Sequence, residues 1–375
     1  MIIWRDGVVR RLLGGWPGAV ELEVDVDGSP MRALAYPQLV GDVLVGDRVL
    51  LTASALVRGL GTGGYAMVVA VPDRLPPDAP PQAGHIVKAR YTPLQPMVLG
   101  VDEQESPWHE VLRDADDLAQ MPVVVADLHS ALPAVVAGAR LAAERAGSPA
   151  PRVAYVMTDG GALPAWFSRS AAALREAGWL EATITVGQAF GGDLEAVTVH
   201  SGLLAARHVL GADLAVVAQG PGNLGTGTRW GFSGVSAGEA VNATATLHGR
   251  PVASLRVSGA DPRERHLGVS HHSLTAYGRV ALAPADVVVP VLQGELAELG
   301  ERIEEQAQAL TRAAAGHRVV RVSVDGLAAA LEGTPVRLTT MGRGLGEDPA
   351  AFLAAGAAGV HAASFVSGYQ GGQPA

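Results

Sequence analysis

The segment from Asp261 to His272 (DPRERHLGVSHH) holds the densest group of side chains that could do acid–base or binding chemistry. It contains three of the eleven histidines of the chain, together with Arg263 and Arg265. Imidazoles titrate near neutral pH, and guanidinium groups bind carboxylates and phosphates. The sequence therefore predicts a site where the two arginines hold an anionic group and a histidine acts as general acid or base. The three histidines are His266, His271 and His272.

Two other interpretations of this segment stay open. In the first, the three histidines bind a divalent metal, with Asp261 as a carboxylate ligand. The spacing argues against it, because His266 and His271 share no helix face and consecutive residues of a strand point to opposite sides. In the second, Arg263, Glu264 and Arg265 form surface ion pairs, and the histidines cap a helix that begins at Ser273.

Polar loops follow six of the predicted strands, and in an open α/β sheet ligands bind beyond the carboxyl ends of the strands. One edge of the sheet is therefore predicted to form a ligand site. The acid–base candidates in these loops are His129, Asp159 and Asp193, and Arg343 is a candidate anion ligand.

The loop that begins at Gly220 is glycine-rich and follows a predicted strand. GPGNLG (220–225) matches the G-x-G-x-x-G dinucleotide fingerprint, but no helix opens directly after it and no acidic residue follows at the expected distance. The sequence therefore argues against NAD or FAD and leaves two alternatives, an anion-binding loop and a structural Ω-loop. The predicted anion ligands here are Gly220, Gly222, Asn223, Gly225, Thr226, Thr228 and Arg229.

Lys88 is the single lysine among the 28 Lys and Arg residues. A lone lysine in an arginine-rich chain indicates an amine that guanidinium cannot replace. We predict that Lys88 lies at the rim of the cleft that the Gly220 loop lines, where it would neutralise an anionic ligand. The alternative is a solvated lysine on an edge strand.

Composition restricts the class of protein. The chain of 375 residues has 48% hydrophobic residues, a net charge of −9 and no cysteine. The acidic charge argues against a nucleic-acid partner, and the missing thiols exclude disulfides and thiolate chemistry. No apolar run is long enough to span a membrane, and the first residues lack a signal-peptide pattern, so we expect a cytoplasmic protein without a membrane partner. Homo-oligomerisation stays open.

Hydrophobic periodicity divides the chain into segments. Residues 1–71 alternate with period two and indicate a small β-barrel-like domain, and residues 72–84 form a proline-rich connector. Residues 85–366 alternate apolar strands with Ala-rich helices, including an amphipathic helix over 295–315 and a strand over 336–340. This pattern predicts an α/β (Rossmann-like) domain with a mainly parallel, doubly wound sheet. Residues 367–375 are expected to be a disordered tail.

Several of these segments form long blocks, among them MTDGGALP (157–164), QGPGNLGTGTRWGFSG (219–234) and DPRERHLGVSHHSLT (261–275). They resemble the recurring blocks of an uncharacterised bacterial family, domain of unknown function 3866, over nearly the whole chain. The resemblance implies a cytoplasmic location, and it supplies no activity and no catalytic residues.

Three functional hypotheses follow. The first is an enzyme or binding protein for a small anionic metabolite, a phosphate or carboxylate, bound at the carboxyl edge of the sheet. The second is a metal-dependent hydrolase that uses the three histidines, with a divalent metal as cofactor. The third is a non-catalytic ligand-sensing or interaction protein.

Overall fold

The N-terminal strands close into a five-stranded barrel in the order β1-β2-β3-β5-β4. The computed structural model describes residues 1–61 and 63–366. In β2 the apolar side chains of Leu22, Val24 and Val26 point into the barrel core, as the period-two alternation predicts. The strands are β1 (Trp4–Trp16), β2 (Ala19–Val26), β3 (Ser29–Ala35), β4 (Arg48–Thr52) and β5 (Ala66–Ala70), with short helices α1 (Pro37–Val40) and α2 (Ser54–Val57) between them.

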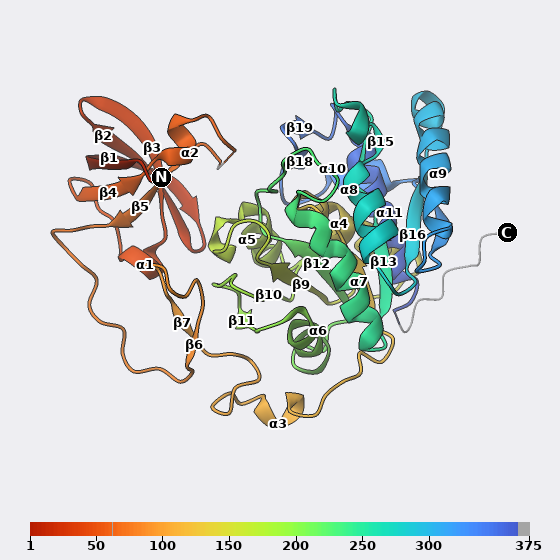
Figure 1. Ribbon diagram of the computed structural model, residues 1–375, viewed down its shortest axis with the longest axis horizontal. Coiled ribbons are helices and arrows are strands. Elements are labelled where there is room, and N and C mark those ends of the chain that lie inside the picture. Colours follow the sequence, from red (N-terminus) through yellow and green to blue (C-terminus); the bar gives the residue numbers. More distant parts are fainter. Residues whose placement is uncertain (62, 367–375) are drawn as a thin grey trace.

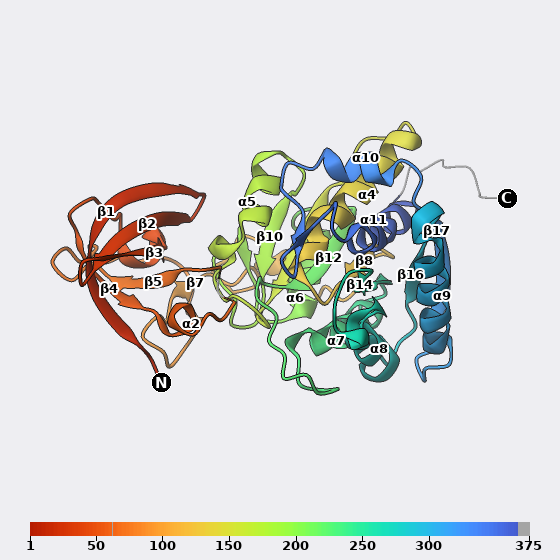
Figure 2. The same ribbon diagram turned by 90° about the horizontal axis from the view of Figure 1, so that it is seen from above.

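The chain then passes through residues 72–84, which carry no helix or strand. Beyond them lie a small two-stranded sheet of β6 (Ile86–Val87) and β7 (Met97–Val98), and helix α3 (His109–Leu112). Figures 1 and 2 show the barrel on one side of the α/β part and this segment running between the two.

The α/β part is built on an eight-stranded sheet in the order β11-β10-β9-β12-β8-β13-β16-β17, with parallel pairing throughout. Every residue of the three central strands β8, β9 and β12 is buried, as expected for parallel strands covered on both faces. The strands are β8 (Pro122–Val125), β9 (Val153–Thr158), β10 (Ala182–Thr185), β11 (Leu194–Glu195), β12 (Leu214–Gln219), β13 (Arg250–Ser254), β16 (Asp286–Val291) and β17 (Arg318–Ser323).

Helices cover both faces of this sheet, which confirms the predicted doubly wound α/β class (Figure 2). Helices α4 (Leu132–Arg145), α10 (Leu327–Glu332) and α11 (Pro349–Ala363) lie on one face, and α6 (Val199–His208) and α7 (Ser236–Thr246) lie on the other. A Cβ on Gly138 would lie 1.9 Å from the carbonyl oxygen of Gly356, so α4 and α11 pack backbone to backbone. The remaining helices are α5 (Arg169–Glu176), α8 (His271–Thr275) and α9 (Ala297–Thr311).

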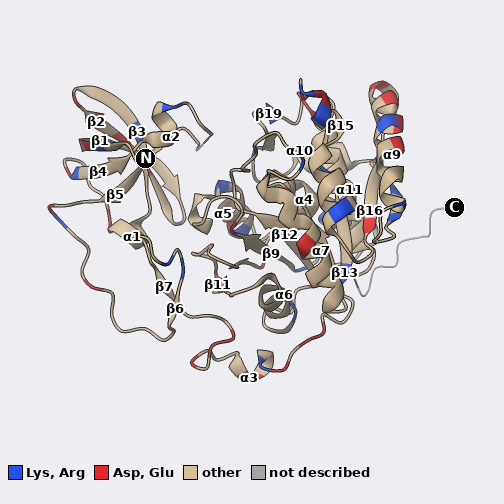
Figure 3. Ribbon diagram, viewed as in Figure 1, with Lys and Arg blue, Asp and Glu red and all other residues tan. Residues whose placement is uncertain are grey.

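Helix α9 lies within the predicted amphipathic segment 295–315 and contains four glutamates and Arg302, and its charged positions are coloured in Figure 3. The prediction of a strand over 336–340 was wrong in its length and in its assignment to the main sheet. Only β18 (Thr339–Thr340) forms, and it pairs with β19 (Arg343–Gly344) outside the main sheet. A second small pair joins β14 (Val257–Ser258) to β15 (Gly268–Val269).

No helix in the described part of the chain combines the length and the apolar character that crossing a bilayer requires. The tail predicted over 367–375 lies outside the described residues.

Candidate functional site

A cavity of about 620 Å³ lies at the carboxyl ends of the central strands and extends to the barrel. This volume is within the range of small-ligand pockets. Its α/β side is formed by loops that follow β8, β12 and β13, by the start of α5 and by the 261–272 segment. Its barrel side is formed by Trp16, Gly61, Gly63 and Tyr65. The cavity is therefore shared by the two parts of the chain.

The three histidines of the 261–272 segment meet on the α/β side of this cavity. One ring nitrogen from each of His266, His271 and His272 lies within 4.8 Å of the others. The β14–β15 pair folds the chain back, and Ser270 then caps α8 by accepting the backbone N–H of His272. The Ser270 hydroxyl also lies 2.8 Å from Nδ1 of His266. One serine thus fixes the relative position of two of the imidazoles.

His272 is the most firmly held of the three rings. It stacks on Phe232 with ring centroids 3.8 Å apart and planes 5° from parallel. Its Nδ1 lies 3.0 Å from Nη1 of Arg256. Because a guanidinium group can only donate, Nδ1 of His272 accepts this hydrogen bond, and the ring proton of a neutral His272 is then on Nε2.

Burial and neighbouring positive charge disfavour protonation of the other two histidines. Burial, with the charges of Arg256 and Arg263, lowers the pKa of His266 to about 3. Burial, with the charges of Arg265 and Arg256, lowers the pKa of His271 to about 4. Both imidazoles are therefore neutral at pH 7, and an anion that offsets the arginine charges would raise both pKa values.

Four arginines line the same cavity, and three of them, Arg256, Arg263 and Arg265, lie close to the histidines in the chain. Arg256 is buried, with Nη1 3.9 Å from the Asp127 carboxylate. Arg263 makes a bidentate pair with Asp261 through Nε at 2.9 Å and Nη2 at 2.8 Å. Arg265 is exposed, and a Cβ on Gly227 would lie 3.8 Å from its Nη2. Arg265 therefore lies beside the loop that begins at Gly220.

Four buried side-chain atoms have no hydrogen-bond partner in the part of the chain that the structure describes, and all four lie at this edge. They are Oδ2 of Asp127, Oγ1 of Thr158, Oε1 of Gln219 and Nε2 of His271. Asp127, Thr158 and Gln219 stand at the ends of β8, β9 and β12, and His271 opens α8. Each such atom costs about 1–3 kcal/mol, and such atoms are typical of catalytic or ion-binding positions.

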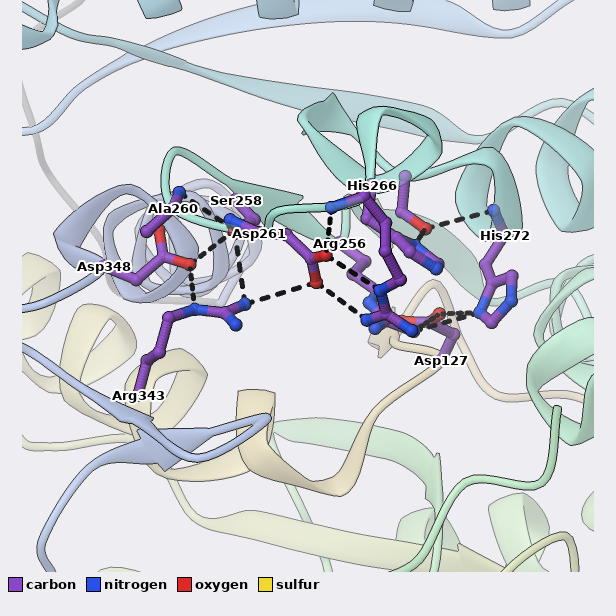
Figure 4. Close-up of polar contacts among 11 residues, drawn as sticks. Asp127, Arg256, Ser258, Ala260, Asp261, His266, His272, Arg343 and Asp348 are labelled. Atoms are coloured by element: carbon purple, nitrogen blue, oxygen red, sulfur yellow. Dashed lines mark hydrogen bonds and ion pairs between the residues drawn. The ribbon is translucent and has the colours of Figure 1, made fainter. Parts of the chain in front are cut away.

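Arg343 lies behind this wall and joins two buried carboxylates (Figure 4). Its Nε donates to Asp348 at 3.1 Å, and its Nη2 lies 3.4 Å from Asp261. Asp348 and Asp261 are 1% and 4% exposed, so the ion pairs replace solvation that these carboxylates lose on folding. The hydrogen bond from Arg263 is the main reason that the pKa of Asp261 lies well below its usual value.

His129, which lines the same cavity, is the centre of a hydrogen-bonded chain. The Tyr155 hydroxyl donates to the carbonyl oxygen of Gln219 at 3.0 Å and lies 2.9 Å from Nδ1 of His129. Nδ1 of His129 therefore carries the proton, and Nε2 accepts from the Ser168 hydroxyl at 2.7 Å. Ser168 also caps α5 by accepting the N–H of Ala171. This chain ties β8, β9 and α5 together.

The family described as "Protein of unknown function (DUF3866)" matches residues 32–359. The chain belongs to this family. The match confirms the resemblance of the sequence blocks. No curated protein and no solved structure matches the chain. The family description names no activity, so roles of individual residues have to be argued from geometry.

Most of the predicted site residues do line the cavity. They are His129, Gly220, Gly222, Asn223, Gly225, Arg263, Arg265, His266, His271 and His272. The spacing argument against a metal site was wrong, because His271 and His272 begin a helix and the β14–β15 pair returns the chain to His266, so that one ring nitrogen from each lies within 4.8 Å of the others. The helix predicted from Ser273 thus starts two residues earlier.

Asp159 and Asp193 are not among the residues that line the cavity, contrary to the prediction of one common cleft. Asp159 instead accepts the N–H of Gln188 at 2.8 Å, which fixes the turn after β10. Asp193 accepts from Arg175 at 2.9 Å and from the N–H of Thr183 at 2.7 Å. Both carboxylates hold local turns.

Other predicted ligands also lie away from the lining. Thr226 and Thr228 contact each other at 3.1 Å across the exposed tip of the 220–231 loop, and Arg229 is exposed there. Asp261 and Arg343 form the buried ion-pair group behind the wall. Asp261 is therefore not a free carboxylate for a metal.

The prediction that Lys88 lies at the rim of this cleft was wrong, and so was the alternative of a solvated lysine. Lys88 is 1% exposed and lines a different hollow. Its ammonium pairs with Glu195 at 2.8 Å and donates to the carbonyl oxygens of Thr185 and Ala189. Three partners match the three donors of the amine, so Lys88 fastens the segment after the connector to the β10–β11 edge.

Sequence reasoning missed Arg256, Phe232, Ser168 and the barrel residues of the cavity. Arg256 lies in the two-residue break between β13 and β14, where a lone arginine carries no motif. A signal was available for Ser168, because it precedes the Ala-rich helical segment at an N-cap position.

The environment of His129 predicts a pH dependence of stability. Burial lowers the pKa of His129 from 6.5 to about 4, so below pH 6.5 the unfolded chain binds a proton that the folded chain does not. The contribution of the neutral His129 to the free energy of unfolding is therefore fully present above pH 6.5, and it is lost as the pH falls toward 4. Between pH 6.5 and pH 4 the wild type should lose unfolding free energy, and His129→Gln should lose about 1–3 kcal/mol less, as measured by urea titration.

The matched control is His200→Gln at an exposed histidine, which should leave the pH dependence unchanged. Equal pH profiles for wild type and His129→Gln would contradict the neutral, enclosed state of His129.

Proposed function

We propose that this protein is a cytoplasmic enzyme that acts on a small anionic metabolite bound at the carboxyl edge of the sheet. The observation that carries the proposal is the convergence, in one cavity, of four arginines with a cluster of three imidazoles. Cationic side chains in a partly enclosed cavity attract an anion, and guanidinium groups match phosphate and carboxylate oxygens.

In this proposal the arginines hold the anionic group and the histidines move a proton. Arg256 and Arg265 would contact the anion. Arg263 is already paired with Asp261, so it would act mainly by its positive charge near the anion. Neutral imidazoles can accept a proton, and a bound anion raises their pKa toward the working pH. His271 is the imidazole whose Nε2 has no partner among the described residues, so it is our choice of general base.

The 220–231 loop adds backbone groups to this anion site. Gly220, Gly222 and Gly225 line the cavity, and Gly222 has a φ of +94°, which favours glycine. Glycines let the backbone approach a ligand closely. Because the loop lies beside Arg265, its backbone would also contact an anion that Arg265 holds.

The same histidines support a second candidate, a hydrolase that depends on a divalent metal. Three ring nitrogens within 4.8 Å of one another can converge on one ion, and Oδ2 of Asp127, which has no hydrogen bond among the described residues, lies 3.7 Å from His272 and could add a carboxylate ligand. A dication would be repelled by Arg256 and Arg265, so the anion proposal stands first. Metal analysis of the purified protein separates the two, because the metal hypothesis requires about one equivalent of bound metal.

The experiment that tests the first proposal uses Arg265→Ala. Arg265 is exposed, so the substitution should leave the fold intact while removing a charge-assisted contact to the anion. We expect the affinity for ribose 5-phosphate, measured by calorimetry at fixed ionic strength, to fall by about tenfold or more.

Arg279→Ala is the matched control, because Arg279 is equally exposed and lies outside the cavity lining. It should leave the affinity unchanged. If both variants lost the same affinity for ribose 5-phosphate, the effect would come from the net charge of the protein, and the proposed site would be wrong.

A further inference from the structure

The cavity has two chemically different ends. The charged end holds the histidines and arginines described above. The other end, at the barrel, presents three aromatic side chains: Trp16, Tyr65 and Phe167. These residues come from β1, from the segment before β5 and from the turn before α5, so the aromatic end forms only where the barrel meets the α/β part.

The aromatic end is held in place by contacts on both sides. Nε1 of Trp16 donates to the carbonyl oxygen of Trp166 at 2.7 Å, and the Arg169 guanidinium lies 4.2 Å from the Trp16 ring centroid. Arg169 also donates to the Tyr65 hydroxyl at 2.8 Å. Fixed aromatic rings bind flat groups with little loss of conformational entropy.

Charge at this end is only partly compensated within the protein, because one carboxylate faces two guanidinium groups. Glu21 pairs with Arg169 at 2.7 Å and with Arg32 at 2.8 Å. The two guanidinium groups also lie against aromatic rings, Arg169 against Trp16 and Arg32 against Tyr65. A net positive charge remains beside Glu21, and the rings of Trp16, Tyr65 and Phe167 add surfaces on which a planar group can stack, while the other end suits an anion.

Close packing shapes this end for a flat ring. A Cβ on Gly63 would lie 3.0 Å from Cζ of Phe167 and 3.2 Å from the Tyr65 ring, at a φ of +69°. The glycine thus lets the barrel loop approach both rings without filling the space beside them.

We propose that the ligand is a nucleoside monophosphate, with its phosphate at the Arg256 and Arg265 end and its base against the aromatic end. This inference rests on the proposed function, because it places the phosphate in the anion site. A ligand of this class has an anionic group and a planar ring at opposite ends, and the cavity of about 620 Å³ reaches both parts of the protein.

The test compares three probes by calorimetry on the full chain: adenosine 5′-monophosphate, ribose 5-phosphate and adenosine. Stacking of a base on an aromatic side chain should make the monophosphate bind at least about fivefold more tightly than ribose 5-phosphate. Phe167→Leu should remove most of this preference and leave the affinity for ribose 5-phosphate unchanged. The unchanged affinity would also show that the variant is folded. Trp16→Leu, on the barrel side, should do the same.

Phe365→Leu is the matched control, since Phe365 is also partly buried but lies outside the cavity lining. It should keep the wild-type preference. Equal affinities for the monophosphate and ribose 5-phosphate would overturn the nucleotide inference and leave the anion site standing. A preference that survives in both Phe167→Leu and Trp16→Leu would also overturn it. Failure of all three probes to bind would overturn the proposed function itself.

Discussion

Arg256→Met is expected to lower the affinity for ribose 5-phosphate by about 100-fold, the upper range for a lost charge-assisted contact. Arg256 is the buried arginine of the cavity, and its partners His272 and Asp127 hold it in place. The substitution also leaves the Asp127 carboxylate buried without its cation. We therefore expect a loss of about 3–5 kcal/mol in the free energy of unfolding at pH 7, measured by urea titration.

A double variant separates these two effects. Asp127→Asn combined with Arg256→Met removes both charges, so much of the stability should return. Affinity for ribose 5-phosphate should not return, because the anion ligand is still missing. A double variant that binds as tightly as wild type would show that Arg256 acts only on the fold.

Arg343→Met should produce a comparable loss of stability, about 3–5 kcal/mol, with little change in ligand affinity. Arg343 bridges Asp348 and Asp261, which are both buried, and it lies outside the cavity lining (Figure 4). Asp261 retains Arg263, so the larger part of the loss comes from Asp348. Chemical denaturation measures the first quantity, and calorimetry with ribose 5-phosphate measures the second.

The comparison variant is Arg152→Met. Arg152 pairs with Glu181 at 3.1 Å, but both side chains are largely solvent-accessible, so the loss should be at most about 1 kcal/mol. If Arg343→Met cost no more than Arg152→Met, the buried ion-pair group would not contribute to stability as argued here.

Periodicity predicted the fold class because the two kinds of sheet have different burial patterns. Barrel strands such as β2 bury about every second side chain, while β9 and β12 bury every residue. The first pattern appears in the sequence as alternation of apolar and polar residues, and the second as continuous apolar runs. Helix α11 was not predicted. It packs against α4 and against several strands, so it is apolar around its circumference and shows no amphipathic stripe.

The candidate site was predicted in part. The histidines and the Gly220 loop stand out by residue type, and strand-end logic brought them to the same edge. Asp159 and Asp193 follow strands in the same way but turn toward neighbouring backbone amides, which sequence order does not reveal. Lys88 was singled out for its rarity, and its burial against Glu195 depends on a contact more than 100 residues away in the chain. Arg256 and the barrel residues of the cavity could be found only from tertiary structure.

An anion bound among the arginines should raise the pKa of the neighbouring histidines. The most direct measurement follows the imidazole resonances by NMR as a function of pH, with and without sulfate, which keeps its charge over the range. Sulfate should shift the signals of His266, His271 and His272 in a saturable way and raise the pKa of His266 and His271 from about 3 and about 4. Exposed His200 should not respond. Unchanged pKa values for the cluster, or equal shifts at His200, would contradict the account.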